Sequence, residues 1–290
     1  MKRIVLLLTA VFIIFVSAGC SSASHGATIA ATTLPVYEFT SLLCQGTDIG
    51  VTRLITEEVT CLHDYTLQVR QMRSLEQAEL VVISGAGLED FLGGALHTTN
   101  NILDASRGIS LQCNDGDHDH GGHGHEEDPH IWLSPENARQ MAHNIYDGLI
   151  NHYPQHSQIF SENLTLLDAK FDGLIQYAEA ELENISYHEL ITFHDGFSYM
   201  AEAFDLTILH AIEEESGSEA SAAELIELIN IVSAHGVHAI FTEKNSSSAG
   251  ASIVAAEAGT AIYDLDMALS GDSYFTAMYH NIDTLKEALK

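Results

Sequence analysis

The sequence is poor in basic residues, in proline and in long apolar runs, and each shortage excludes a class of protein. It has 11 lysines and arginines against 41 aspartates and glutamates, a formal net charge of −30. A nucleic-acid binder needs a basic face that neutralises phosphates, so this balance excludes that function. Only 4 prolines interrupt a chain that is 46% hydrophobic, which excludes a disordered acidic tail. Beyond the N-terminus no stretch approaches the roughly 20 apolar residues of a membrane-spanning helix.

The N-terminal segment has the pattern of a secretion signal that ends in a lipidation site. Two basic residues precede an apolar run, 4–16, which is shorter than a membrane span, and small residues follow it. This pattern, with Cys20 directly after it, resembles a bacterial lipobox, in which Cys20 is acylated and begins the mature chain. The alternative is an ordinary secretion signal with an incidental cysteine. We expect a signal peptide over 1–19, a lipid-anchored tether over 20–26 and a protein held outside the bacterial cytoplasmic membrane.

Besides Cys20, the chain has three cysteines, Cys44, Cys61 and Cys113. Disulfides persist outside the cytoplasm, so we expect Cys44 and Cys61 to pair. Their bridge would close a loop of about 17 residues and stabilise the fold by roughly 3 kcal/mol in the chain-entropy model. The alternatives are free buried thiols, or Cys61 as a metal ligand because it lies two residues before His63. Cys113 has no partner in this scheme.

Short β-rich runs alternate with helical patterns in two sets that share one architecture. The first set belongs to an expected N-terminal lobe, 27–155, and the second to a C-terminal lobe, 187–290. Between them, 156–186 has helical periodicity and no proline, which predicts a long rigid linking helix. We therefore predict an α/β protein of two similar lobes, each with a mostly parallel sheet covered by helices. The predicted strands are 27–33, 50–55, 79–84, 190–193, 206–211, 238–243 and 261–265, and the predicted helices are 66–77, 135–150, 158–184, one from 196, 220–234, 247–257 and 274–289.

The most unusual segment is 115–128, which holds four histidines and six carboxylates among four glycines. Glycine favours a flexible chain, and imidazoles close to each other can share a divalent ion. We predict an auxiliary metal-binding loop; the alternatives are a solvated polar loop or a pH-responsive patch, since histidine titrates near pH 6.5. The loop does not choose among zinc, nickel and copper. Its histidines are His118, His120, His123 and His125.

Three further histidines, His63, His130 and His194, lie where strands are expected to turn into helices. Taken singly, each could equally be a capping or core residue. The pairs His63–Asp64 and His194–Asp195 repeat one motif in the two halves of the chain. In both pairs the aspartate can cap the next helix or orient the imidazole from behind. Together the three histidines form a candidate set of metal ligands.

With these motifs the sequence resembles the zinc-binding solute receptors of metal-uptake ABC transporters, the cluster A-I (cluster 9) family, over essentially the whole mature chain. The resemblance implies one metal ion in the cleft between the lobes, with His63, His130 and His194 as imidazole ligands. The fourth ligand would be Asp266, with Asp264 or water as alternatives. The motifs that carry the resemblance are HDYTLQVRQMRSLEQAELVVISGAGLEDFL, DPHIWLSPENARQMAHNI, HDGFSYMAEAFDL and GDSYFTAMYHNIDTLKEAL.

The resemblance also implies a function without catalysis. We expect a monomeric receptor, lipid-anchored outside the cell, that captures Zn²⁺ and delivers it to an ABC permease. Manganese-type relatives place a carboxylate where this chain has His194, and imidazole suits Zn²⁺ better than Mn²⁺. The alternatives are a manganese-type receptor of the same family, an adhesin-like surface lipoprotein, and a zinc hydrolase. A hydrolase is disfavoured because the chain has no His-Glu-x-x-His motif and no nucleophile or base beside the three histidines.

Overall fold

The computed structural model describes most of the chain beyond the N-terminal segment. The predicted signal peptide and tether, Cys20, His63, Cys61 and the histidine-rich segment with Cys113 lie outside the described residues. The residues described are 28–59, 62, 65–97, 101–112, 127–211, 220–246 and 249–290.

Two four-stranded sheets form the frame, and every strand pairing between described residues is parallel. The order is β2-β1-β3-β4 in the N-terminal lobe and β6-β5-β7-β8 in the C-terminal lobe, which is the same topology twice. The prediction of two similar α/β lobes is therefore confirmed. The strands are β1 (Thr28–Ala31), β2 (Gly50–Arg53), β3 (Leu80–Ile83), β4 (Ile102–Asp104), β5 (Glu189–Thr192), β6 (Thr207–Ala211), β7 (Ala239–Glu243) and β8 (Ala261–Leu265).

The central strands have the composition that a parallel sheet requires. Helices cover both faces of such a sheet, so a central strand is apolar without alternation. Every residue of β7 is buried, whereas the neighbouring edge strand β8 is mostly exposed or half-buried. The carboxyl ends of β5, β7 and β8 lie at one edge of the sheet, which is where parallel α/β sheets place ligand sites.

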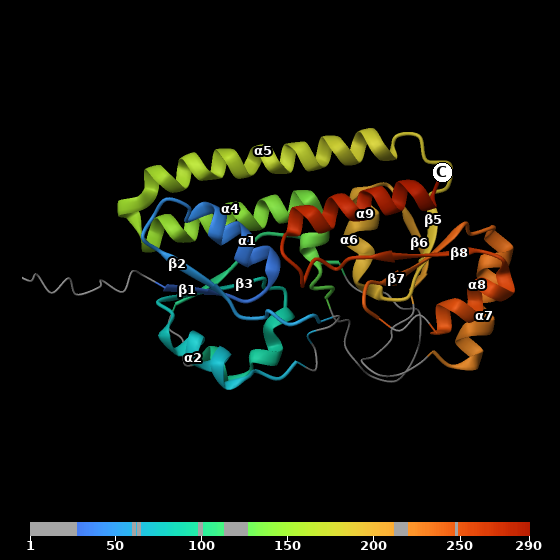
Figure 1. The fold of residues 1–290 in the computed structure, drawn as a ribbon, viewed down its shortest axis with the longest axis horizontal. Coiled ribbons are helices and arrows are strands. Elements are labelled where there is room, and N and C mark those ends of the chain that lie inside the picture. The colour runs from blue at the N-terminus through green and yellow to red at the C-terminus, as the bar shows by residue number, and fades with distance from the viewer. Residues whose placement is uncertain are drawn as a thin grey trace, which may run out of the picture.

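The helices lie around these sheets, and α5 runs along both lobes in Figure 1. Its 26 residues, about 39 Å at 1.5 Å per residue, carry a buried stripe near the helical period that includes Phe160, Leu167, Phe171 and Leu174. Neither α5 nor any other helix of the described ranges is long and apolar enough to cross a membrane. The helices are α1 (Leu34–Leu43), α2 (Val69–Gln77), α3 (Gly94–His97), α4 (Pro135–His152), α5 (Ser157–Leu182), α6 (Ser198–Ala203), α7 (Ala222–His235), α8 (Ala249–Ala258) and α9 (Tyr274–Ala288), with 3₁₀ turns η1 (Leu88–Leu92), η2 (Ile131–Leu133), η3 (Pro154–His156) and η4 (Asp195–Phe197).

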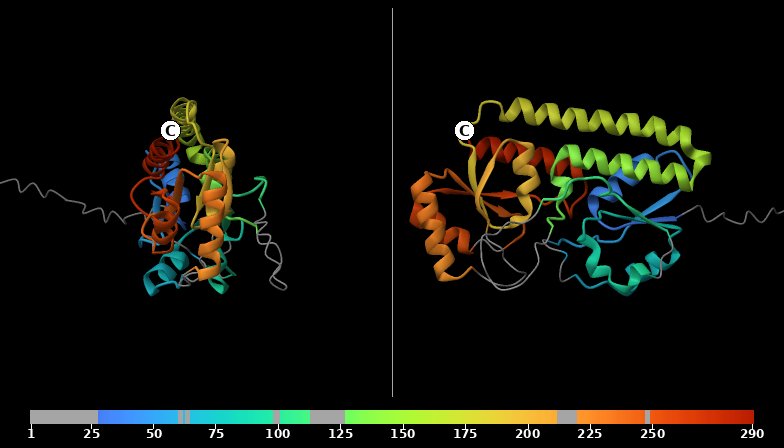
Figure 2. Two further views of the ribbon diagram at one scale, coloured as in Figure 1. Left: turned by 90° about the vertical axis from the view of Figure 1, so that its right-hand side faces the viewer. Right: turned by 180° about the vertical axis from the view of Figure 1, so that it is seen from behind.

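The last helix, α9, crosses back and joins the two lobes a second time. Figure 2 shows it beside α4 and α5. The ring of Tyr274 packs edge-to-face on Phe39 of α1, with centroids 5.0 Å apart, and Phe275 lies 5.1 Å from Phe171 of α5. The Glu38 carboxylate accepts hydrogen bonds from the backbone N–H of Tyr274 and the hydroxyl of the preceding serine. α9 therefore packs on N-terminal elements although it ends the chain.

The segment that leads into α9, 266–273, is also fastened to the N-terminal lobe. The Arg53 guanidinium donates to the carbonyl oxygens of Gly271 at 2.7 Å and Leu269 at 3.3 Å. The Trp132 indole donates from Nε1 to the carbonyl of Met267 at 2.8 Å. The connection after β8 thus has direct hydrogen bonds to the N-terminal lobe.

Two hydrophobic cores divide the molecule unequally. The larger one includes the N-terminal sheet, α1, α4, α5, α9 and one face of the C-terminal sheet, represented by Phe241. The smaller one lies between the other face of that sheet, represented by Ile240, and helices α7 and α8. Successive residues of β7 therefore contribute to different cores, as the alternation of side chains along a strand requires.

Cys44 is the one member of the expected disulfide that the structure describes. Cys44 caps the C-terminus of α1, is buried, and is a free thiol among the described residues. Burial raises the pKa of its thiol to about 12. Because the thiolate is the reactive form, such a cysteine is an inert core residue. Because Cys61 lies outside the described residues, the expected bridge between Cys44 and Cys61 stays a prediction.

Candidate metal centre

His130 is held by its own segment of the N-terminal lobe. The backbone N–H of His130 and its ring atom Nδ1 both lie within hydrogen-bond distance of Asp128 Oδ1, at 2.9 Å and 2.8 Å. Asp128 is fully buried and His130 is 5% exposed. A carboxylate at Nδ1 fixes the ring and its tautomer and leaves Nε2 as the metal-binding nitrogen. This is the arrangement of a supported histidine ligand.

The residues around this segment fix it from both lobes. The Tyr199 hydroxyl of α6 donates to the carbonyl of Asp128 at 2.9 Å, and it accepts from the backbone N–H of Gln112 at 2.9 Å. The Tyr274 hydroxyl of α9 donates to the carbonyl of Trp132 at 2.9 Å. Aromatic hydroxyl groups thus satisfy backbone groups that the short turn η2 leaves unpaired.

His194 reaches the same place from the C-terminal lobe. It follows β5 and precedes η4, and its ring centroid lies 5.3 Å from that of His130 at 83° between the ring planes. Its side chain is 13% exposed, and Nδ1 lies 3.8 Å from the Asp195 carboxylate, an ion-pair distance but too long for a hydrogen bond. The structure therefore brings together two of the predicted imidazole ligands from different lobes.

Gly196 permits this close approach. A Cβ atom built there would lie 2.7 Å from Nδ1 of His130 and 2.7 Å from the terminal methyl of Met267. Both distances are shorter than real Cβ contacts allow. The glycine is required because the turn after His194 packs directly on the His130 ring and on the segment after β8.

Asp266 directly follows β8, and hydrogen bonds from α9 hold its backbone in place. The Asn281 side chain of α9 accepts from the N–H of Asp266 and donates to its carbonyl, both at 2.8 Å. Its carboxylate oxygen Oδ1 accepts from the N–H of Ala268 at 2.8 Å, and Oδ2 pairs with Nζ of Lys244 at 2.8 Å. The hydrogen bond and the charge of Asp266 raise the pKa of Lys244.

Asp264, the alternative ligand, lies in a different environment. Its side chain is exposed on the edge strand β8, and its Oδ1 accepts from the hydroxyl of Thr242. The side chain of Asp266 is only 13% exposed, and the next residue, Met267, is the one that packs at Gly196.

The described residues contain the predicted centre only in part. His130 and His194 are adjacent, and Asp266 belongs to the segment that contacts them, but His63 is outside the described ranges. Within those ranges no three histidine, cysteine, aspartate or glutamate side chains converge closely enough to hold a metal ion. Whether the four predicted ligands share one ion therefore stays a prediction.

Sequence reasoning missed two charged residues of the centre. The role of Asp128 could have been predicted, because it precedes His130 by two residues in the motif Asp-Pro-His. Lys244 directly follows the predicted strand 238–243 and Asp266 directly follows 261–265, so a correct strand register would have placed them side by side.

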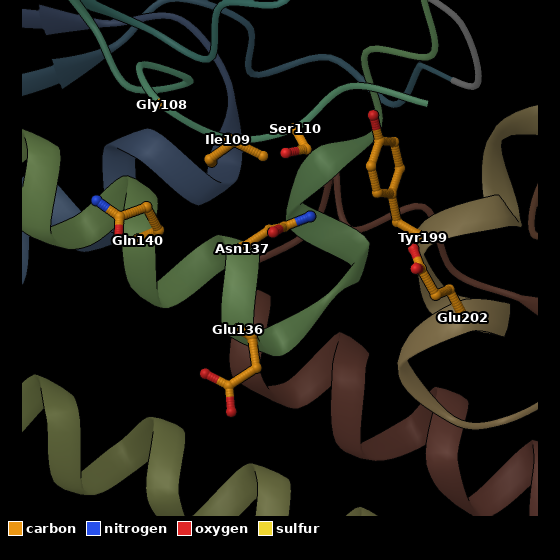
Figure 3. Close-up of a pocket in the computed structure, with 8 residues that line it drawn as sticks. All are labelled: Gly108, Ile109, Ser110, Glu136, Asn137, Gln140, Tyr199 and Glu202. Carbon is orange, nitrogen blue, oxygen red and sulfur yellow. The ribbon is translucent and has the colours of Figure 1, made fainter. Parts of the chain in front are cut away.

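A cavity of about 510 Å³ lies next to this centre but does not include it. Figure 3 shows lining side chains from the loop 108–110, the beginning of α4, and α6. Tyr199 and Glu202 of α6 belong to it, and Glu202 also accepts from the Gln112 side chain. None of the described candidate ligands lines this cavity; its lining is Gly108, Ile109, Ser110, Glu136, Asn137, Gln140, Tyr199 and Glu202.

The two parallel sheets, the linking helix and the histidine pair between the lobes define a two-lobed solute receptor. A family model described as zinc-uptake complex component A, periplasmic (ZnuA), matches residues 29–288. The chain belongs to this family.

Individual relatives agree with the family match. A putative metal-binding protein of Treponema pallidum is 27% identical, and the alignment covers 95% of this chain and 93% of that protein. The zinc-binding lipoprotein AdcA of Streptococcus pneumoniae is 30% identical over 99% of this chain, which spans only 61% of AdcA. The crystal structure of the Zn(II)-bound ZnuA-like domain of AdcA is similar with a TM-score of 0.76 at 26% identity, covering 91% of this chain and 98% of that domain.

Proposed function

We propose that this protein is an extracytoplasmic receptor that captures Zn²⁺ and delivers it to a membrane ABC permease. The observation that carries the proposal is the meeting of His130 and His194, from different lobes, at ring centroids 5.3 Å apart. Asp128 orients one of these rings, as a carboxylate behind a ligating histidine does. Membership of the zinc-uptake family and the likeness to a Zn(II)-bound domain support the same function.

The donor set that we propose is His63, His130, His194 and Asp266. Zinc binds neutral imidazole nitrogen at about 2.0–2.1 Å and prefers four tetrahedral ligands, which three histidines and one carboxylate provide. Asp266 is favoured over Asp264 because it is the more buried and its chain neighbour packs on the turn that follows His194. No catalytic step is needed, because the ion itself is the cargo.

The choice of zinc over manganese follows from the ligand types. Affinity of nitrogen sites rises from Mn²⁺ towards Cu²⁺ and Zn²⁺, whereas Mn²⁺ depends on oxygen ligands. His194 is the position where manganese-type relatives place a carboxylate, so we propose it as the selector.

We also propose that the receptor is a monomer held at the membrane by a lipid on Cys20. The relative AdcA is a lipoprotein, which supports this anchor. Both statements can be checked on protein from the native host, by mass spectrometry of the N-terminal peptide and by light scattering.

The histidine-rich segment is proposed as an auxiliary metal-binding loop. Deleting 117–127 should remove weaker zinc equivalents and leave one tight equivalent, because glycine-rich chain must lose conformational entropy to wrap an ion. Calorimetry of the deletion variant measures the number and affinity of both the weak and the tight zinc equivalents. Loss of the tight equivalent would instead assign His118, His120, His123 or His125 to the main centre.

The test of the main proposal is metal binding by the chelator-stripped mature chain. We expect one tight zinc equivalent per chain by calorimetry and elemental analysis, strongly weakened in His63→Ala and His130→Ala. The matched control is His143→Ala, since His143 also pairs with a carboxylate, Asp168 at 2.8 Å, but on the α4–α5 surface. The proposal would be refuted by a wild-type chain without a tight zinc equivalent. It would also be refuted if the control variant bound zinc as weakly as the ligand variants.

A further inference from the structure

Lys244 and Asp266 are brought together by the pairing of two parallel strands. Glu243 of β7 lies opposite Leu265 of β8, so the next residue of each strand, Lys244 and Asp266, emerges at the same edge of the sheet. The backbone N–H of Lys244 continues the ladder by donating to the carbonyl of Leu265 at 2.8 Å. The ammonium lies 2.8 Å from Oδ2 of Asp266. Lys244 therefore forms an ion pair with the carboxylate that we propose as the fourth metal ligand.

The two oxygens of this carboxylate have partners of unequal mobility. Oδ1 accepts from the backbone N–H of Ala268, a fully buried residue in the segment fastened to the N-terminal lobe. Among the described residues, the partner of Oδ2 is the flexible side chain of Lys244, which is 52% exposed. An ion that takes Asp266 as a ligand would therefore reach it through Oδ2, by displacing the ammonium and leaving the backbone bond intact.

A second carboxylate lies close enough to influence a displaced ammonium. Glu58 of the N-terminal lobe accepts from the side chain of Asn245, the residue after Lys244, at 3.0 Å. The charge of Glu58 also acts on Lys244 and raises its pKa. A displaced ammonium would therefore remain beside an anion.

We propose that Lys244 is a specificity-determining residue: a tethered cation that neutralises Asp266 in the metal-free protein and penalises ions that need its oxygen. This inference rests on the proposed function. Three imidazoles supply most of the binding of Zn²⁺, and water can replace Asp266 in the fourth position, so the Lys244–Asp266 pair costs zinc little. Mn²⁺ depends on hard oxygen ligands and must break that pair. The lysine thus adds a cost to manganese that zinc can avoid.

The test compares Lys244→Met with Lys244→Arg, which keeps the positive charge. Removing the cation should raise Zn²⁺ affinity by only about 2- to 3-fold, through lost repulsion, and Mn²⁺ affinity by about 10-fold, as expected when a partly exposed pair no longer has to be broken. Competition binding with both metals alone, at fixed ionic strength, gives the zinc-to-manganese ratio. Lys244→Arg should keep the wild-type ratio, and so should Lys286→Met, which removes a lysine paired with Glu181 away from the centre.

A double-mutant cycle checks that the effect acts through Asp266. In an Asp266→Asn background, Lys244→Met should no longer change the metal ratio, because coupled residues lose their interaction when either partner is removed. An unchanged ratio in Lys244→Met, an arginine variant that behaves like methionine, or an effect that persists without Asp266 would each overturn the inference. A wild-type chain that fails to bind zinc would instead refute the proposed function, so the two failures are distinguishable.

Discussion

The two histidines of the centre meet edge-to-face, but the segments that carry them are supported differently. His130 has a hydrogen-bonded carboxylate at 2.8 Å, and that carboxylate is fully buried. Nδ1 of His194 lies 3.8 Å from the carboxylate of Asp195, whose side chain is 25% exposed. The 128–133 segment is embedded in the larger core, whereas β5 sends Ile191 into the smaller core under α7 and α8. The two rings therefore differ in their contact with the neighbouring carboxylate: Nδ1 of His130 is within hydrogen-bond distance of it, whereas Nδ1 of His194 is not.

The largest expected effect tests whether both segments contribute ligands at all. His130→Ala and His194→Ala should each weaken zinc binding by at least about 100-fold, because each removes a coordinate bond, and loss of an outer hydrogen bond alone costs about 10–100-fold. Competition against a chromophoric chelator measures the affinity. Near-wild-type zinc affinity in His194→Ala would show that His194, and with it this part of the C-terminal lobe, contributes no ligand.

The next effect tests the difference in support directly. Asp128→Asn should weaken zinc binding by about 10–100-fold, because the amide no longer fixes the charge and tautomer of His130. The matched variant Asp195→Asn should cost less than about 3-fold, since 3.8 Å is too long for a hydrogen bond between the carboxylate and Nδ1 of His194. Titration calorimetry of both variants is sufficient. Equal losses in the two would show that the supports do not differ in function.

A smaller effect is expected at the contact between the segments. Gly196→Ala places a Cβ against both His130 and Met267, so the two histidines must separate. We expect zinc binding to weaken by about 10-fold. We also expect the free energy of unfolding to fall by about 1–3 kcal/mol, because the site becomes overpacked. The control is Gly94→Ala, because a Cβ at Gly94 meets no atom within 4 Å. Thermal melting with and without zinc separates the two losses. An unaffected Gly196→Ala would show that the close approach is not needed for binding.

The smallest expected effect concerns Glu89, a buried carboxylate in the N-terminal lobe. Glu89 accepts from the Thr32 hydroxyl and from the N–H groups of Ser84 and Gly85, and burial raises its pKa to about 7. Its folded pKa exceeds its unfolded one, so the folded state holds an extra proton between about pH 4.5 and 7, and stability falls as pH rises through that window.

Between pH 5.5 and 6.5 the contribution of Glu89 should fall by about 1 kcal/mol. The measurement is urea unfolding of wild type and Glu89→Gln at both pH values. The stability advantage of wild type over the variant should shrink by that amount as pH rises. A difference that does not change with pH would mean that Glu89 titrates outside this window.

Much of the fold could be predicted because it depends on local patterns. Continuous apolar strands and the 3.6-residue stripe of α5 predicted both sheets and the linking helix. Three helices or strands were missed. β4 and α3 are only three and four residues long. α1 is so apolar that its residues show little contrast between faces, although Pro35 near its first turn was a start signal. The burial of Cys44 in the core is another property that spacing along the chain does not reveal.

The centre was predictable as a set of residue types but not as a geometry. The positions of His130 and His194 at strand-to-helix turns followed from the sequence, yet their meeting depends on how two lobes pack. The roles of Asp128 and Lys244 depend on side-chain contacts, one local and one set by strand register. Long-range packing therefore decides which of the available polar residues act together.

The hydrogen bonds that join Arg53, Trp132 and Glu38 to the segment 266–274 have a consequence for the heat capacity of binding. Together with α5 and α9 they join the lobes at several places, so opening the cleft widely would break buried contacts at each of them. Zinc should therefore enter a receptor that buries little new apolar surface on binding, and the heat-capacity change of binding should be small. A permease that distinguishes loaded from empty receptor would then respond to local rearrangement around His194 rather than to a large change in shape.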